Sequence, residues 1–156
     1  MSQAQLKHEI ISRSVADSWE DARREWALRE VYFASEPEQC LCGQFPIIEI
    51  CVLMNRRNGY EAVVGNVCVK RFLRLPSDRI FPGLKRIQVK PAAALTEEAI
   101  EYAFERGWIN SWERGFYLDT RTKRKMSERQ AAIRLEINEK VSAGVARDAR
   151  PARGIR

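Results

Sequence analysis

The chain has 156 residues and 45% hydrophobic content, which fits one soluble domain with its own core. Its first residues, Met1–Glu9, lack the apolar stretch of a secretory signal, and no apolar run approaches the roughly 18 residues that span a bilayer, so we expect a cytoplasmic protein without membrane contact. The net charge of +6 is uneven, because residues 1–120 hold 16 basic and 17 acidic side chains whereas residues 121–156 hold 11 and 4, which indicates a basic C-terminal arm on a near-neutral body.

The N-terminal part predicts a short strand followed by a helix. Residues 6–13 fit a strand, and Ser14 with Asp17 has the spacing of a capping box at a helix start. Four apolar side chains then recur at helical spacing, which predicts a helix over residues 14–29 with one buried face: Val15, Trp19, Ala22 and Trp26.

A β-hairpin is predicted near the middle of the chain. Residues 46–54 are rich in strand-forming residues, and residues 60–64 form the returning strand. The connection, residues 55–59, ends in the Asn-Gly pair that is typical of tight hairpin turns. The segment 67–73 is expected to form a short helix after the hairpin.

The C-terminal part predicts one more strand and two helices. Residues 85–90 fit a strand, and Thr96 is placed as the N-cap of a helix that ends near Gly107. Ser127 and Gln130 have the spacing of a capping box that opens a further helix.

From residue 144 onward the chain is dominated by Ala, Arg, Gly and Pro, which do not bury enough apolar surface to fold. We therefore assign residues 1–143 to one α+β domain and residues 144–156 to a disordered basic tail. Within the domain we expect a central zinc-binding hairpin over residues 38–74, flanked by N- and C-terminal helices.

Four cysteines lie within 29 residues, and the rest of the chain has none. Cytosolic thiols stay reduced, so this cluster is more typical of a metal site than of disulfides, although a disulfide or free-thiol state is the alternative. Cys-x-Cys-Gly forms a tight turn that offers two ligands, and a cysteine at a helix start is favoured as an anion. We predict Zn²⁺ held tetrahedrally by four thiolates, from Cys40, Cys42, Cys51 and Cys68.

Cys51 has two interpretations, because it lies within the first strand of the predicted hairpin. It is either the remaining zinc ligand or a small buried core residue, and in the second case water or a non-cysteine side chain completes the shell. His8, the single histidine, has no local signal that brings it to the site.

Part of the sequence resembles a small zinc-finger module of uncharacterised bacterial, phage and plasmid proteins. The resemblance is carried by four successive stretches: Cys-Leu-Cys-Gly, Pro-Ile-Ile-Glu-Ile-Cys, Asn-Arg-Arg-Asn-Gly and Val-Gly-Asn-Val-Cys-Val-Lys-Arg-Phe-Leu. It is similar in architecture to zinc ribbons and treble-clef fingers, over residues 38–74. It departs from the commoner fingers in using Cys-x-Cys for Cys-x-x-Cys and one cysteine, not two, on the closing helix. The resemblance implies a structural zinc and binding to nucleic acid or protein, with no specific activity.

The motifs of the common enzyme classes are missing. A single histidine excludes the His-Glu-x-x-His helix of metalloproteases, and neither the zinc-deaminase signature nor a P-loop is present. A shell of four cysteines also leaves no open position for a substrate. We therefore expect a protein that is not an enzyme.

Nucleic-acid binding, to DNA or RNA, is the leading hypothesis. We expect salt-dependent contacts to the phosphate backbone with little direct base readout, and base stacking if the aromatic group Trp108, Trp112, Phe116 and Tyr117 is exposed and not in the core. The alternative is a zinc-stapled protein-interaction module, such as a phage- or plasmid-encoded adaptor or inhibitor of a host protein. The basic residues predicted to contact nucleic acid lie in three groups: Arg56 and Arg57; Lys70, Arg71 and Arg74; and Arg121, Lys123, Arg124 and Lys125.

Overall fold

The computed structural model describes residues 3–73 and 77–149. The chain divides into two compact units, one built from residues up to Asp78 and one over Arg79–Asp148, where the sequence analysis treated residues 1–143 as one domain. We call them the sheet unit and the helical unit. The described residues form a three-stranded antiparallel sheet and seven α-helices, so the predicted α+β class is confirmed.

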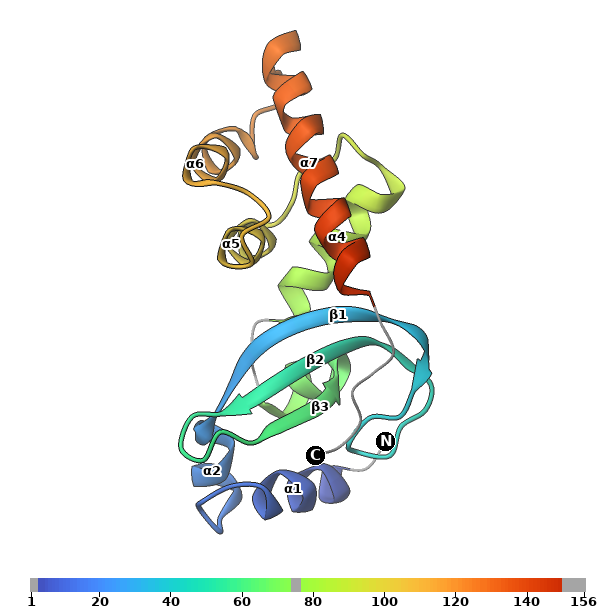
Figure 1. Ribbon diagram of the computed structural model, residues 1–156, viewed down its shortest axis with the longest axis vertical. Coiled ribbons are helices and arrows are strands. Elements are labelled where there is room, and N and C mark those ends of the chain that lie inside the picture. The colour runs from blue at the N-terminus through green and yellow to red at the C-terminus, as the bar shows by residue number, and fades with distance from the viewer. Residues whose placement is uncertain (1–2, 74–76, 150–156) are drawn as a thin grey trace. The chain divides into compact units, whose positions relative to one another are not determined.

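The sheet has the strand order β1-β2-β3, with β1 over Trp26–Glu38, β2 over Ile47–Asn55 and β3 over Glu61–Gly65 (Figure 1). The predicted hairpin is confirmed as β2 and β3, and Gly59 adopts the positive φ of +77° that the turn requires. Four consecutive residues at the centre of β2, from Ile50 to Leu53, are buried. Because side chains alternate between the two faces, both faces of this strand are covered.

The predicted helix over residues 14–29 is wrong. Only Trp19–Ala22 (α2) is α-helical, a 3-10 turn follows over Arg23–Glu25, and Trp26 already pairs with Asn55 of β2. The helical spacing of these four apolar residues was outweighed by strand pairing. The β-forming run Val31-Tyr32-Phe33 pairs with three consecutive residues of β2, and the strand extends back from it to Trp26.

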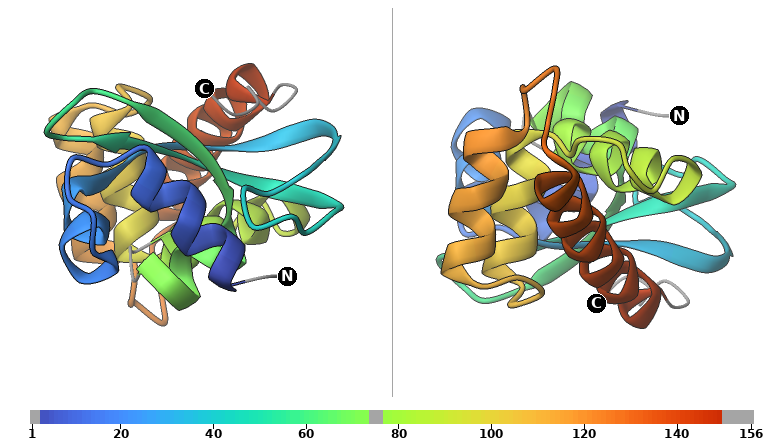
Figure 2. Two further views of the ribbon diagram at one scale, coloured as in Figure 1. Left: turned by 90° about the horizontal axis from the view of Figure 1, so that it is seen from below. Right: turned by 90° about the horizontal axis from the view of Figure 1, so that it is seen from above.

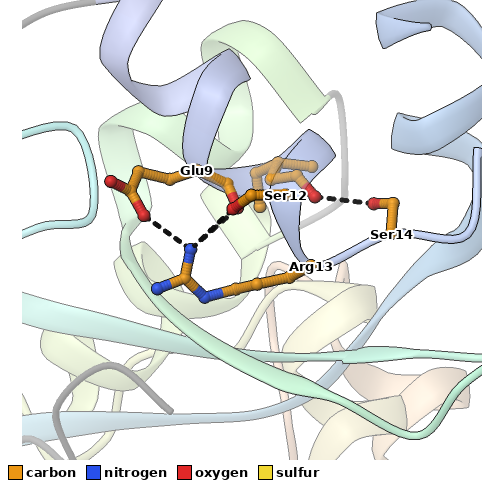
Figure 3. A network of polar contacts seen from close by, with 5 residues as sticks. Glu9, Ser12, Arg13 and Ser14 are labelled. Atoms are coloured by element: carbon orange, nitrogen blue, oxygen red, sulfur yellow. Dashed lines mark hydrogen bonds and ion pairs between the residues drawn. The ribbon is translucent and has the colours of Figure 1, made fainter. Parts of the chain in front are cut away.

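The predicted strand over residues 6–13 is also wrong, because this segment belongs to helix α1, Gln3–Ser12. Leu6 and Ile10 are fully buried one turn apart, which is the helical signal in this segment. Arg13 ends the helix by donating hydrogen bonds to the Glu9 carbonyl at 2.8 Å and to the Glu9 carboxylate at 2.6 Å (Figure 3).

The helical unit contains α4 from Arg79 onward and the three helices that follow it, α5, α6 and α7, with α5 and α6 side by side (Figures 1 and 2). Thr96 caps α5 by accepting the Ala99 N–H at 3.2 Å, and Ser127 and Gln130 form a reciprocal capping box before α7, so both predicted caps are confirmed. The helices extend over Ser77–Val89 (α4), Glu97–Glu105 (α5), Ser111–Thr120 (α6) and Glu128–Asp148 (α7).

Two further expectations for this part of the chain are corrected. Residues 85–90 were predicted as a strand, but α4 continues to Val89 with Pro82 inside it, and Leu84 and Ile87 are buried at helical spacing. Residues 144–148 were predicted to be disordered, but α7 continues to Asp148, since Gly144 and Val145 are buried along its inner face. The rest of the predicted tail, from residue 150, lies outside the described residues.

A buried polar cluster connects α6, α7 and the segment after α4. The Tyr117 hydroxyl donates to Asn138 Oδ1 at 2.6 Å and accepts the Leu95 N–H at 3.0 Å, while Asn138 Nδ2 donates to the carbonyls of Pro91 and Ala93. These buried polar groups are therefore satisfied by one another. Within residues 3–73 and 77–149, no helix combines the length and apolar character that a membrane crossing needs.

Gly144→Ala is expected to lower the free energy of unfolding by about 1–3 kcal/mol, because overpacking a well-filled site forces side chains from their positions. A Cβ at this position would lie 2.3 Å from Cδ2 of Trp108, a rigid indole. The control is Gly115→Ala in α6, where nothing lies within 4 Å of the new Cβ and helix propensity is expected to raise stability by up to about 1 kcal/mol. Denaturant unfolding followed by circular dichroism measures both values, and equal effects of the two substitutions would contradict this packing.

Candidate metal centre

Three of the four cysteines converge in the sheet unit. The Sγ atoms of Cys40, Cys42 and Cys68 all lie within 4.8 Å of one another, and the three side chains are no more than 2% exposed. A group of thiol sulfurs at this spacing can hold a metal ion.

Cys40 and Cys42 lie in a tight turn between β1 and β2. The turn is closed by the Cys40 N–H, which donates to the Gln44 carbonyl at 2.9 Å, and by the Gly43 N–H, which donates to the Cys40 carbonyl at 2.8 Å. Gly43 has a φ of +94°, which other residues adopt only with strain, so glycine is required here. The Cys42 N–H points at the Cys40 sulfur at 3.5 Å, and the Gln44 N–H at the Cys42 sulfur at the same distance. The turn therefore presents two sulfurs with backbone donors directed at them.

Cys68 follows β3, the second strand of the hairpin, and lies at its base. β3 ends at Gly65, a short helix, α3, covers Asn66–Cys68, and a π-helical turn follows over Val69–Leu73. The Gly65 N–H donates to the Cys40 sulfur at 3.3 Å, so the end of β3 contacts the turn that precedes β2. The cluster thus closes the base of the hairpin.

The electrostatics of the cluster favour a cation. The Cys68 thiol donates a hydrogen bond to the Cys40 sulfur, and this bond with the N–H groups of Cys42 and Gly65 outweighs burial and lowers the pKa of Cys40 to about 5. The same hydrogen bond, together with burial, raises the pKa of Cys68 above its ordinary value. These hydrogen bonds favour the anionic form of one buried sulfur, and a cation beside it would stabilise that charge.

Cys51 is placed in the sheet and not in the group of converging sulfurs. It lies in the middle of β2, paired with Val31 on one side and Val64 on the other, and is fully buried. Burial raises the pKa of this thiol to about 12, although a hydrogen bond with Ser77 acts in the opposite direction. Cys51 thus lies buried in the sheet, outside the group of three sulfurs, which agrees with the second interpretation of this position. His8 is exposed on α1 and is not in the group either.

The predicted basic residues of the sheet unit lie at opposite ends of the hairpin. Arg56 and Arg57 are exposed in the turn, while Lys70 and Arg71 are exposed just after Cys68 at the base of the hairpin, and Arg74 lies outside the described residues. β3 ends at Gly65, which pairs with Ile50, five residues from Asn55 at about 3.3 Å each, so the hairpin separates its turn from its base by about 15–20 Å. They form two separate basic positions and not a ring around the cysteines.

The turn of the hairpin borders a pocket of about 420 Å³ that contains a further arginine, Arg24. Arg24 lines it with Arg56 and Arg57, and Arg56 Nη2 donates to the Arg24 carbonyl at 3.1 Å. Two acidic residues, Asp21 and Glu25, line the same pocket. In the sequence Arg24 stands between Arg23 and Glu25, about 30 residues before the turn, so only the fold reveals that it lies next to the turn.

Glu25 holds this end of the hairpin in place. Its carboxylate accepts hydrogen bonds from Asn55 Nδ2 at 2.9 Å and from the N–H groups of Val15 and Ala16 at 2.8 Å. Burial acts to raise the pKa of Glu25, but these hydrogen bonds and the nearby Arg57 outweigh it and hold the pKa below its ordinary value. The buried carboxylate is therefore ionised at neutral pH, and the accessible charges around the pocket are the three exposed guanidinium groups and the exposed carboxylate of Asp21.

In the helical unit, the loop between α6 and α7 carries the third basic group. Lys123, Arg124 and Lys125 are exposed and Arg121 is half-buried. Nearby on α6, Tyr117 belongs to the core, whereas Trp112 and Phe116 lie on the outer face. Of the four aromatic side chains that the sequence singled out, only Trp112 is exposed; Phe116 is half-buried, as is Trp108, which packs edge-on against Tyr102.

Comparisons of the chain with known protein families, with curated proteins and with solved structures give no match. The assignment of function therefore rests on the residues themselves and on the geometry that brings them together.

Proposed function

We propose that the protein is a zinc-containing, non-enzymatic protein that binds nucleic acid through contacts to the phosphate backbone. The observation that carries the proposal is the convergence of three buried sulfurs at the base of a hairpin whose turn presents exposed arginines.

Zinc is the metal that this donor set favours. Thiolates are soft ligands that select zinc in a tetrahedral site with Zn–S distances of about 2.3 Å, and three sulfurs within 4.8 Å of one another suit that geometry. Cys40, Cys42 and Cys68 would supply three ligands, with water or a non-cysteine side chain as the fourth. The group is almost completely buried, which denies a substrate access to the metal and supports a structural and not a catalytic role.

The basic side chains support a polyanionic partner. The guanidinium groups of Arg24, Arg56 and Arg57 are exposed around the pocket at the turn, and Lys70 and Arg71 are exposed near the base. Arginine suits phosphate because its planar fork donates two hydrogen bonds at once.

A protein-interaction module is the competing function, and one observation favours it. Phe45, three residues after Cys42, and Val67, directly before Cys68, are 64% and 51% exposed, and Ile48 near the start of β2 is 48% exposed. Exposed apolar side chains of this kind are typical of surfaces that dock on another protein. Binding to such a partner would be weakly dependent on salt, whereas binding to nucleic acid falls steeply as salt rises.

Substitution of each cysteine in turn distinguishes the cysteines that bind the metal from the cysteine that belongs to the core. Cys40→Ser, Cys42→Ser and Cys68→Ser are each expected to lose zinc and to destabilise the sheet unit, because structural zinc contributes folding free energy directly. Cys51→Ala is the matched control and is expected to retain one zinc per chain, even if it lowers the melting temperature through a small cavity. Native mass spectrometry counts the metal. Loss of zinc from Cys51→Ala, or its retention in the other three variants, would contradict the assignment.

The arginines at the turn are tested by the salt dependence of binding. Arg56→Ala with Arg57→Ala is expected to weaken binding of a 20-base-pair duplex equally for unrelated sequences, and to reduce the slope of log affinity against log salt by about 2, since each phosphate contact contributes about 0.9. Arg129→Ala with Arg147→Ala, on exposed positions of α7, changes the net charge by the same amount and is expected to leave that slope almost unchanged. Fluorescence anisotropy at several salt concentrations provides the slopes. Equal slopes for both double variants would reject the turn as a contact site.

A further inference from the structure

The outer face of α6 carries an exposed tryptophan, Trp112, stacked on a half-buried phenylalanine, Phe116. Trp112 is 62% exposed, and its ring stacks on that of Phe116 with 5.4 Å between the centroids and 17° between the planes. The two residues are one helical turn apart, so their side chains adjoin on the same face. The inner face of this helix holds Glu113, Tyr117 and Thr120, which are buried.

An indole exposed to this degree needs a reason, because tryptophan is usually one of the most buried side chains in a fold. Trp108 shows the contrast: it packs edge-on against Tyr102 with the centroids 5.6 Å apart, and its indole fills the space beside Gly144. Trp112 makes no comparable contribution to the core. Its ring, nearly parallel to that of Phe116, forms a flat aromatic surface open to solvent.

The charges next to this surface are basic. Arg121, Lys123, Arg124 and Lys125 follow directly after α6, and no acidic residue occurs between residues 120 and 127. Arg121 follows Phe116 by five residues, about 8 Å along a helix at 1.5 Å per residue. Two of the acids in this region are already ion-paired, Glu113 with Lys140 at 2.6 Å and Glu101 with Arg114 at 2.7 Å. Asp119 remains as an exposed acid at the end of α6.

We propose that Trp112 and Phe116 stack on unpaired bases of a single-stranded nucleic acid, while the basic loop of residues 121–125 contacts its phosphates. This inference rests on the proposed function and names the class of nucleic acid that the helical unit takes. A flat aromatic surface stacks on a base only where the base is not already stacked and paired within a duplex. The adjacent positive charge favours a polyanion over an uncharged apolar peptide as the occupant of this face.

The test compares a 20-nucleotide single-stranded oligothymidine with a 20-base-pair duplex, both fluorescein-labelled, on the full-length protein with its metal. Trp112→Ala is expected to weaken binding of the single strand by about 5- to 150-fold, the range measured for loss of one stacked base, and to leave duplex binding unchanged. Trp112→Phe keeps an aromatic ring and is expected to restore most of the affinity. Trp19→Ala, a half-buried tryptophan in the sheet unit, is the control for general effects of losing an indole.

The outcomes separate this inference from the proposed function. If the wild-type protein binds neither probe, the proposed function fails and this inference fails with it. If duplex binding persists and responds to Arg56→Ala with Arg57→Ala while Trp112→Ala leaves single-strand binding unchanged, only the stacking surface is rejected. If sedimentation shows that the wild-type protein dimerises and that Trp112→Ala abolishes the dimer, the face is a protein interface and the inference is overturned. A melting temperature within a few degrees of wild type shows that each variant is folded.

Discussion

The sheet unit depends on the contact, at the base of the hairpin, between the residues that precede β2 and the residues that follow β3. Cys40 and Cys42 precede β2, Cys68 follows β3, and the Gly65 N–H donates to the Cys40 sulfur, so one cluster fixes both ends of the β2–β3 pair. The sheet unit is built chiefly from the residues up to Asp78 and buries only a modest apolar core, which a metal or disulfides commonly supplement in small domains. A metal ion bound by the three sulfurs would directly join the turn before β2 to the helical segment after β3, which are more than 20 residues apart in the sequence.

This constraint also decides where the charges lie. Because the cysteines close the base of the hairpin, the turn with Arg56 and Arg57 is held at the far end of two paired strands, while Lys70 and Arg71 stay near the base. Glu25 also holds the turn in place, because its carboxylate accepts a hydrogen bond from the side chain of Asn55 at the end of β2. The proposed phosphate contacts at the turn are therefore carried by two paired strands, whereas the proposed base-stacking surface belongs to a separate helical unit. A protein built this way would engage duplex and single-stranded segments with different parts of its chain.

Local signals predicted the parts of the structure that depend on short-range chemistry. The Asn-Gly turn, the Thr96 cap and the Ser127–Gln130 box all formed as expected, because each is decided by a few adjacent residues. The helix over residues 14–29 and the strand over residues 85–90 did not, since pairing with β2 in one case and burial of Leu84 and Ile87 in the other outweighed local spacing. The cysteine cluster was visible from spacing, but the position of Cys51 required the strand register, which puts it between Val31 and Val64.

The most direct test of the account is X-ray absorption at the zinc edge on the purified protein, which counts the sulfur atoms bound to the metal. The account predicts three sulfurs at about 2.3 Å and one lighter ligand, nitrogen or oxygen, at about 2.0–2.2 Å. Four sulfurs would show that Cys51 leaves its place in the sheet to bind the metal, which contradicts the role assigned to it. A purified protein without bound zinc would contradict the metal centre itself.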